Sequence, residues 1–255
     1  MLIMDDQIDD YLRHLKEVVS TVLKDRLTGL YLSGSKVLGD YDEEVSDLDI
    51  FCVVNRPIRA EDQQRLLELL SEEELEVPGN GLEFLCVLEE EVTHPHSLPS
   101  YEFVLIKRRG LDAVMKHEGM DEGLLMDFTI CYQSGKLIAG KPAQEVIGEV
   151  PVPWLNEAMK GSLRQHKLNV FHPFYDPYGH EAVLNACRSW CFKELGRMTS
   201  KTKGATWALK RWKNSKVIEQ ALLIREGKWD KRLDEGAVHE LLDHVLTLER
   251  IKVST

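Results

Sequence analysis

The stretch LSGSKVLGDYDEEVSDLDIF, residues 32–51, decides how the first half of this chain folds. An apolar segment runs into Gly34 and Ser35, and a loop of turn formers and carboxylates leads to a second apolar segment that holds Asp47 and Asp49. The second segment is rich in residues that favour β-strands. Because side chains alternate along a strand, both aspartates are predicted on one face and their apolar neighbours on the other.

Two carboxylates at this spacing repel each other and are costly to bury. A Mg²⁺ ion would resolve both problems, since it prefers oxygen ligands and is held by one or two carboxylates together with substrate phosphates. Glu83, the one charged residue in the apolar run GLEFLCV, would add a third carboxylate if its strand lies beside the second strand. The alternative is that Asp47 caps a strand and Glu83 is an edge-strand charge that discourages aggregation.

The Gly34-Ser35 pair predicts a turn that binds phosphate. Glycine allows the backbone to approach a phosphate closely, and the neighbouring N–H groups and a serine hydroxyl can donate hydrogen bonds to it. The segment is not a Walker P-loop, because Gly39 is not followed by Lys and Ser or Thr, and it is not a GxGxxG motif.

The predicted elements divide the chain into an α/β half and a helical half. Strands are expected at 28–33, 47–54 and 82–88, with helices at 5–26 and 60–75. This order favours a nucleotidyltransferase-like α/β (α+β) unit with a small mixed sheet, residues 1–118. An all-α helical bundle, residues 119–255, is predicted from candidate helices at 120–139, 153–171, 181–196, 203–226 and 235–251.

The composition excludes several functional classes. A formal net charge of −11, from 43 acidic and 32 basic residues, argues against a nucleic-acid binder, which usually carries a basic face. No stretch approaches the length of a bilayer-spanning segment, and the start of the chain does not have the pattern of a signal peptide. Five cysteines without a CxxC pair favour buried free thiols. We therefore expect a cytoplasmic monomer without a membrane or nucleic-acid partner.

The helical half carries a resemblance to a known family. Residues 183–209, VLNACRSWCFKELGRMTSKTKGATWAL, look like the C-terminal domain of the aminoglycoside adenylyltransferases that act on streptomycin and spectinomycin. The matching features are Leu184, Arg188, Trp190, Gly196, Ser200-Lys201 and Trp207-Ala208-Leu209. The Gly-Ser turn and Asp-x-Asp pair of the first half resemble the wider nucleotidyltransferase superfamily that includes DNA polymerase beta.

The resemblance implies a role for each matching position. Asp47 and Asp49 would hold magnesium, and Glu83 would be the base that deprotonates the acceptor hydroxyl. The nucleotide-binding candidates are Gly34, Ser35, Ser46 and Lys201, with ATP as co-substrate and with Lys201 reaching the triphosphate. The acceptor-binding candidates are Asp176, Tyr178 and Glu181.

The expected function is magnesium-dependent transfer of a nucleoside monophosphate, AMP from ATP, to a hydroxyl of a small molecule. An aminoglycoside or aminocyclitol antibiotic would be one such acceptor, with resistance as the consequence. The segment SYEFVLIKRRG lacks the tryptophan that the streptomycin enzymes carry after the third strand, so the resemblance leaves the acceptor open. The alternatives are a non-catalytic nucleotide sensor or antitoxin-like module, which the complete Asp-x-Asp pair disfavours, and an adenylyltransferase that modifies a protein hydroxyl.

Overall fold

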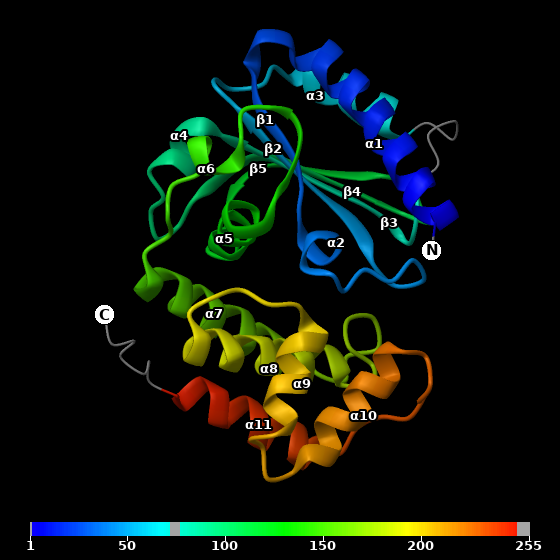
Figure 1. Cartoon of the computed structure of the whole chain (residues 1–255), viewed down its shortest axis with the longest axis vertical. Helices are drawn as coiled ribbons and strands as arrows, with labels where there is room; N and C mark the ends of the chain where they lie inside the picture. Colours follow the sequence, from blue (N-terminus) through cyan, green and yellow to red (C-terminus); the bar gives the residue numbers. More distant parts are fainter. Residues whose placement is uncertain (1, 72–76, 249–255) are drawn as a thin grey trace. The chain divides into compact units, whose positions relative to one another are not determined.

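The computed structural model describes residues 2–71 and 77–248, and the chain forms two compact units that divide between Trp154 and Leu155 (Figure 1). The last residues of the predicted helices 60–75 and 235–251 lie outside the described residues. Within the described residues, no helix is long and apolar enough to span a bilayer.

The first unit is built on a mixed sheet, as predicted. Its six strands are β1 (Leu27–Leu32), β2 (Asp47–Val54), β3 (Gly81–Leu88), β4 (Ser100–Arg108), β5 (Val114–Met120) and β6 (Lys136–Gly140). They follow the order β5-β4-β3-β2-β1-β6, in which β2 and β3 are parallel and all other neighbours are antiparallel. The parallel pair is the part of the sheet that positions the predicted carboxylates.

Two helices cover one face of this sheet. The helices of the first unit are α1 (Leu2–Leu23), a 3-10 turn (Lys24–Arg26), α2 (Gly34–Leu38), α3 (Ala60–Ser71), α4 (Glu89–Thr93), α5 (Leu124–Ser134) and α6 (Ala143–Val146). The helices α1 and α3 lie side by side on the sheet (Figure 1), and Leu15 and Leu66 from them pack with the buried Leu48 and Ile50 of β2. Burying these two apolar residues turns Asp47 and Asp49 to the opposite face, as the alternation predicts.

The opposite face is partly covered by α5. Phe128 of this helix meets Phe51 of β2 edge-on, with ring centroids 5.7 Å apart. Asp47 and Asp49 lie nearer the start of β2 and remain half-buried. The start of the parallel pair therefore keeps its polar side chains within reach of solvent.

The segment after residue 118 differs from the prediction. The helix expected at 120–139 ends at Ser134, and β6 follows it and pairs with β1, for example Ala139 with Leu30. Without β6, the N–H and C=O groups along one edge of β1 would lack partners. Pairing with β1 therefore stabilises Lys136–Gly140 as a strand, although its local sequence pattern is ambiguous. The first unit therefore extends to Trp154, beyond the boundary predicted at residue 118. The strands β4 and β5 were also not predicted.

The described part of the second unit consists of helices and connecting loops. The helices are α7 (Val152–Asn169, which begins just before the division), α8 (His180–Leu195), α9 (Lys201–Leu209), α10 (Ser215–Arg225) and α11 (Glu235–Thr247). The single helix predicted at 203–226 is two helices, because the chain turns between Leu209 and Ser215. Buried Leu184, Ile218 and Leu241 form part of the core between α8, α10 and α11.

Candidate active site

The register of the parallel pair brings three carboxylates together. Asp49 of β2 lies directly opposite Glu83 of β3, and Asp47 lies opposite Gly81. Directly paired residues project from the same face of a sheet, so Asp47, Asp49 and Glu83 share one face near the start of both strands. All three side chains are partly exposed.

The turn at Gly34 is pressed against Asp49. Gly34 has a φ of +59°, and a Cβ added to it would come within 1.7 Å of Oδ2 of Asp49. The N–H of Ser33 donates to the backbone carbonyl of Asp49 at 2.8 Å, and the N–H of Ser35 donates to its Oδ2 at 3.3 Å. Only glycine combines this left-handed conformation with so close an approach. The predicted phosphate-binding turn and the predicted metal ligand thus form one structural unit.

The Ser35 hydroxyl is a buried polar group without a hydrogen-bond partner among the described residues. Its Oγ is shielded from solvent and has no hydrogen-bond partner in the described part of the chain. A buried hydroxyl that stays unsatisfied lowers stability, whereas a bound anionic oxygen would satisfy it. This observation fits the prediction that Ser35 donates to a nucleotide phosphate.

Arg108 joins the carboxylates of the two parallel strands, a contact that the sequence analysis missed. Its Nη1 lies 2.7 Å from Oδ2 of Asp47, and its Nη2 lies 3.9 Å from Oε2 of Glu83. The Nδ2 of Asn80 donates to the other oxygen of Asp47 at 3.4 Å. Because β4 pairs Arg108 with Gly81, the guanidinium lies on the carboxylate face. Recognition of β4 as a strand would have revealed this position.

The pKa of Glu83 is raised above its ordinary value. Loss of water around its carboxyl raises the pKa of Glu83 and the charge on Asp47 raises it further, while Arg108 and Lys116 oppose the shift. The side chain nevertheless keeps 45% of its surface exposed, so a reactant can reach it. A carboxylate with a raised pKa is a better proton acceptor than an ordinary one.

The chemistry of the donor set fits a divalent cation. Asp47 and Asp49 supply oxygen ligands from one face of a strand, which is the donor type that Mg²⁺ prefers. Among residues 2–71 and 77–248, no group of three or more His, Cys, Asp and Glu side chains is arranged as a ready-made metal site. The guanidinium of Arg108 instead balances the charge of Asp47. The carboxylate face therefore already carries one cation, at one of the two aspartates predicted to bind the metal.

Ser46 connects two segments beside the site. Its hydroxyl accepts from the N–H of Asp42 at 3.1 Å, its N–H donates to the Asp42 carbonyl at 2.7 Å, and its carbonyl accepts from the N–H of Asn80 at 3.1 Å. These contacts fix the loop before β2 and the start of β3. A direct role of Ser46 in nucleotide binding stays a prediction.

In the helical unit, the predicted phosphate ligand and one predicted acceptor ligand contact each other. Lys201, the first residue of α9, places its Nζ 2.6 Å from Oε2 of Glu181. Burial raises the pKa of Glu181, but Lys201 and His180 lower it more strongly, and the resulting pKa is about 2. Asn185 donates to the same carboxylate oxygen at 3.4 Å. Glu181 is therefore ionised at neutral pH, and Lys201 of the same unit compensates its charge.

The other two acceptor candidates have structural contacts of their own. Asp176 is 3% exposed, and its two oxygens accept from the N–H groups of Glu181 at 3.2 Å and Ala182 at 2.9 Å, which satisfies the first turn of α8. The carbonyl of Tyr178 accepts from the N–H of Leu233 at 3.0 Å. The structure thus gives Asp176 a capping role that the sequence analysis missed, and acceptor binding by these residues stays a prediction.

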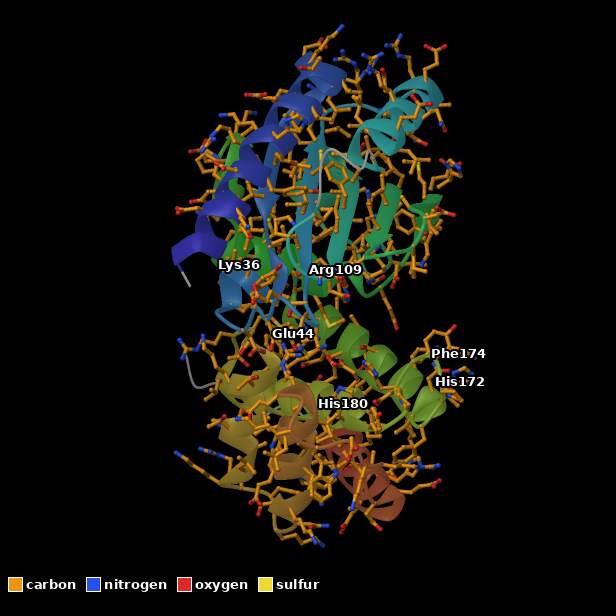
Figure 2. The ribbon with its side chains drawn as sticks, turned by 90° about the vertical axis from the view of Figure 1, so that its right-hand side faces the viewer. Lys36, Glu44, Arg109, His172, Phe174 and His180 are labelled. Atoms are coloured by element: carbon orange, nitrogen blue, oxygen red, sulfur yellow. The ribbon has the colours of Figure 1, made fainter. Side chains whose placement is uncertain are left out.

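Aromatic side chains near Asp176 in the sequence differ in their exposure and contacts. His180, the first residue of α8, is labelled in Figure 2 with His172 and Phe174, which lie on the loop before that helix. Phe174 is 90% exposed, whereas Nδ1 of His180 lies 3.3 Å from Oδ1 of Asp176.

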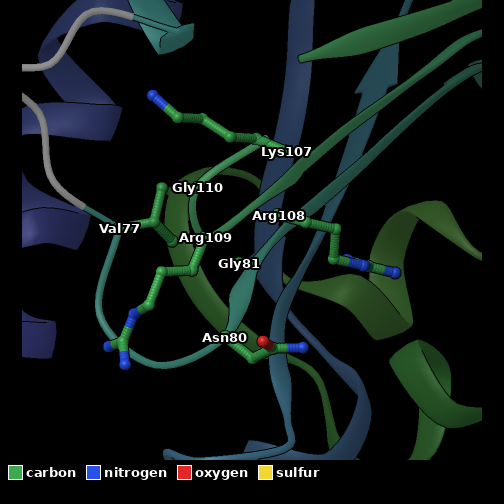
Figure 3. A pocket seen from close by; sticks show the side chains of 7 residues that line it. All are labelled: Val77, Asn80, Gly81, Lys107, Arg108, Arg109 and Gly110. Atoms are coloured by element: carbon green, nitrogen blue, oxygen red, sulfur yellow. The ribbon is translucent and has the colours of Figure 1, made fainter. Parts of the chain in front are cut away.

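A pocket of about 250 Å³ lies where β3 begins and β4 ends (Figure 3). It is lined by Val77, Asn80, Gly81, Lys107, Arg108, Arg109 and Gly110. In Figure 3 the side chain of Arg108 points away from those of Lys107 and Arg109. The register explains the difference for Lys107, since it is paired with the buried Leu82 on the face opposite the carboxylates.

Both units match known families. Residues 12–109 match the model of a nucleotidyltransferase domain, and residues 145–248 match that of the aminoglycoside adenylyltransferase C-terminal domain. A segment of 65 residues is 35% identical to a putative protein adenylyltransferase, MJ0141, of Methanocaldococcus jannaschii. That segment spans 26% of this chain and 65% of the relative, slightly less than two thirds of its length.

The fold is similar to that of a solved enzyme. The crystal structure of spectinomycin adenyltransferase AAD(9) from Enterococcus faecialis with ATP and spectinomycin superimposes with a TM-score of 0.71 and 18% sequence identity. The match covers 93% of this chain and 97% of that enzyme. At this identity the comparison shows a shared fold.

Proposed function

Because this chain is a nucleotidyltransferase of the aminoglycoside adenylyltransferase type, we propose that it transfers AMP from ATP to a hydroxyl group of a small molecule. The observation that carries the proposal is the pairing of Asp49 with Glu83, next to Asp47 and against the Gly34 turn. The ATP and spectinomycin of the AAD(9) crystal structure support ATP as the donor and an aminocyclitol or aminoglycoside as the acceptor.

The reaction balances as a displacement at the α-phosphorus of ATP. The acceptor oxygen forms a bond to that phosphorus, the bond from phosphorus to the bridging oxygen of the β-phosphate breaks, and pyrophosphate leaves. Glu83 takes the proton of the acceptor hydroxyl. Its raised pKa and its partly exposed carboxylate suit this task, since a general base works best when its pKa is near the operating pH.

The remaining site residues bind and orient the nucleotide. Asp47 and Asp49 would hold Mg²⁺, which neutralises the triphosphate and stabilises negative charge that develops during phosphoryl transfer. The backbone N–H groups of the Gly34 turn and the buried Ser35 hydroxyl would donate to phosphate oxygens. Lys201 is our predicted second source of positive charge for the phosphates, and Glu181 holds it in a fixed position.

The direct test is an acceptor screen with ATP and Mg²⁺ over aminoglycosides and aminocyclitols, measuring pyrophosphate release and an acceptor mass increase of one AMP. Glu83→Gln should lower transfer by about 10²–10⁴-fold, the range for loss of a general base, and leave ATP binding nearly unchanged. Glu118→Gln, at an exposed position of β5, is the matched control and should keep wild-type turnover. Full turnover by Glu83→Gln would remove Glu83 from the role of base.

A protein hydroxyl is the second candidate acceptor, favoured by the 35% identity to the putative protein adenylyltransferase. The same reaction with labelled ATP, without a small acceptor and with a cell extract, distinguishes the two. Label on protein, absent in Asp49→Asn, would support this candidate. Label only on the small molecule would exclude it.

A further inference from the structure

Both oxygens of Asp47 are engaged by groups of the chain itself. Arg108 lies 2.7 Å from Oδ2, and Asn80 donates to Oδ1 at 3.4 Å. The side chain of Asp47 is only 18% exposed, and the Nη1 atom of Arg108 is buried. The Arg108 side chain as a whole keeps 33% of its surface exposed, so water screens the pair in part, but less than it screens a pair of fully exposed side chains.

Arg108 is held at this position by the sheet. It is the last residue of β4 and pairs with Gly81, which has no side chain to fill the space above it. A Cβ at Gly81 would lie 2.1 Å from the carbonyl of Lys107, so this position keeps the strands close. The planar guanidinium then spans from Asp47 toward Glu83, whose Oε2 lies 3.9 Å from Nη2.

A divalent ion competes with the guanidinium of Arg108 for the Oδ2 atom of Asp47. Mg²⁺ binds carboxylate oxygens at about 2.0–2.1 Å and demands nearly octahedral geometry, so it needs free directions around each donor. Two cations within a few ångströms of each other also repel. Binding of metal by both aspartates is therefore weakened as long as Arg108 stays on Asp47.

We propose that Arg108 is the counter-cation of this carboxylate face. Without nucleotide, Arg108 pairs with Asp47, and when metal and nucleotide bind, it leaves Asp47 and pairs with a nucleotide phosphate. The proposal rests on the proposed function for the identity of the nucleotide. Its consequence is that metal alone binds weakly, whereas metal and ATP bind cooperatively, because the phosphates give the displaced guanidinium a new partner.

The test measures Mn²⁺ binding, as a stand-in for Mg²⁺, by calorimetry and by electron paramagnetic resonance. Without nucleotide, Arg108→Gln should bind Mn²⁺ about tenfold more tightly than wild type, since a competing charge is gone. With a non-hydrolysable ATP analogue present, this advantage should disappear, and the analogue itself should bind about tenfold more weakly to the variant. A merely structural role of Arg108 would not tighten metal binding.

Two further variants keep the result interpretable. Arg109→Gln removes a neighbouring charge whose side chain points in a different direction from that of Arg108 (Figure 3), and it should leave Mn²⁺ affinity unchanged. Arg108→Lys keeps the charge without the planar fork and should give an intermediate affinity, which preserves the test if Arg108→Gln does not fold. Equal or weaker Mn²⁺ binding by Arg108→Gln, or absence of Mn²⁺ binding in every variant, would overturn the inference.

The failure of this inference can be told apart from failure of the proposed function. If wild type transfers AMP but Arg108→Gln binds Mn²⁺ like wild type, only the role of Arg108 is wrong. If Arg108→Gln binds Mn²⁺ more tightly but no acceptor is ever adenylylated, the counter-cation role stands and the proposed function is wrong.

Discussion

The carboxylate face of the first unit and the acidic pair of the second, Asp176 and Glu181, contain the same residue types but differ in their partners. Asp47 and Glu83 share one cation, Arg108, which lies 2.7 Å from Asp47 and 3.9 Å from Glu83. Asp176 is buried and accepts from N–H groups at the start of α8, and Glu181, whose side chain is 27% exposed, is paired with Lys201. Acidic residues that can exchange partners are suited to chemistry, whereas those with fixed partners stabilise the fold.

This comparison changes how the acidic candidates of the helical unit are interpreted. A carboxylate already paired with an ammonium group at 2.6 Å attracts a cationic acceptor less than a free one would. Attraction of an aminoglycoside by Glu181 is therefore weaker than its sequence position suggests. The following variants test whether the two regions differ as described.

The largest effect is expected for Asp49→Asn. The amide oxygen can still accept from the N–H of Ser35, so the Gly34 turn should persist while the charge for the metal is lost. Transfer should fall by about a thousandfold or more, corresponding to the several kcal/mol that a catalytic metal supplies. Steady-state pyrophosphate release measures the loss, and an unchanged melting temperature shows that the fold is intact. Near-normal turnover would contradict the metal assignment.

Gly34→Ala should be the next most damaging change. The added Cβ would overlap the Asp49 carboxylate, and the positive φ disfavours any side chain by about 1–2 kcal/mol. Loss of ATP binding should accompany a stability loss of about 2–3 kcal/mol, since strain and overpacking both contribute. Denaturant unfolding and nucleotide titration measure the two effects. Gly110→Ala, with φ +73° but no neighbouring atom within 4 Å, isolates the conformational cost alone.

Glu181→Gln tests the fixed pair of the helical unit. The pKa of Glu181 is lowered from 4.5 to about 2, so the unfolded chain binds the proton more readily. Its contribution to stability is fully present above about pH 4.5 and is lost as the pH falls through about 2. We expect the variant to lose about 2 kcal/mol at pH 7 and to lack this part of the acid dependence. Identical pH profiles of unfolding would contradict a structural role for the pair.

The smallest effect is expected for Asp176→Ala, which removes a helix cap. The stability loss should be about 1–2 kcal/mol, because two N–H groups at the start of α8 lose their acceptor in a buried setting. Asp234→Ala removes one comparable contact, to the N–H of Ala237, and should cost less than Asp176→Ala. Chemical denaturation compares the two. A larger loss for Asp234→Ala would show that burial of the cap does not govern its strength.

The sequence predicted the carboxylate face better than its surroundings. Alternation along β2 and β3 is a local property, and it placed Asp47, Asp49 and Glu83 correctly on one face once the strands were parallel neighbours. The strand β6 and the division between α9 and α10 were mispredicted, because their short segments carry patterns compatible with more than one structure.

Residues whose contacts depend on strand register or on the course of a loop could not be found in the same way. Arg108 reaches Asp47 across a strand pairing, and Asp176 meets the start of α8 only because the preceding loop turns back. Both depend on cross-strand register or loop geometry, which tertiary packing decides.

The sequence by itself determined the chemistry of the first unit, since the spacing of Gly34, Asp47 and Asp49 dictates one turn and one acidic strand face. Only the tertiary structure decided which cations pair with the carboxylates, with Arg108 on Asp47 in the first unit and Lys201 on Glu181 in the second. The physical reason is that side-chain alternation follows from covalent geometry, whereas ion pairing depends on distances between segments far apart along the chain.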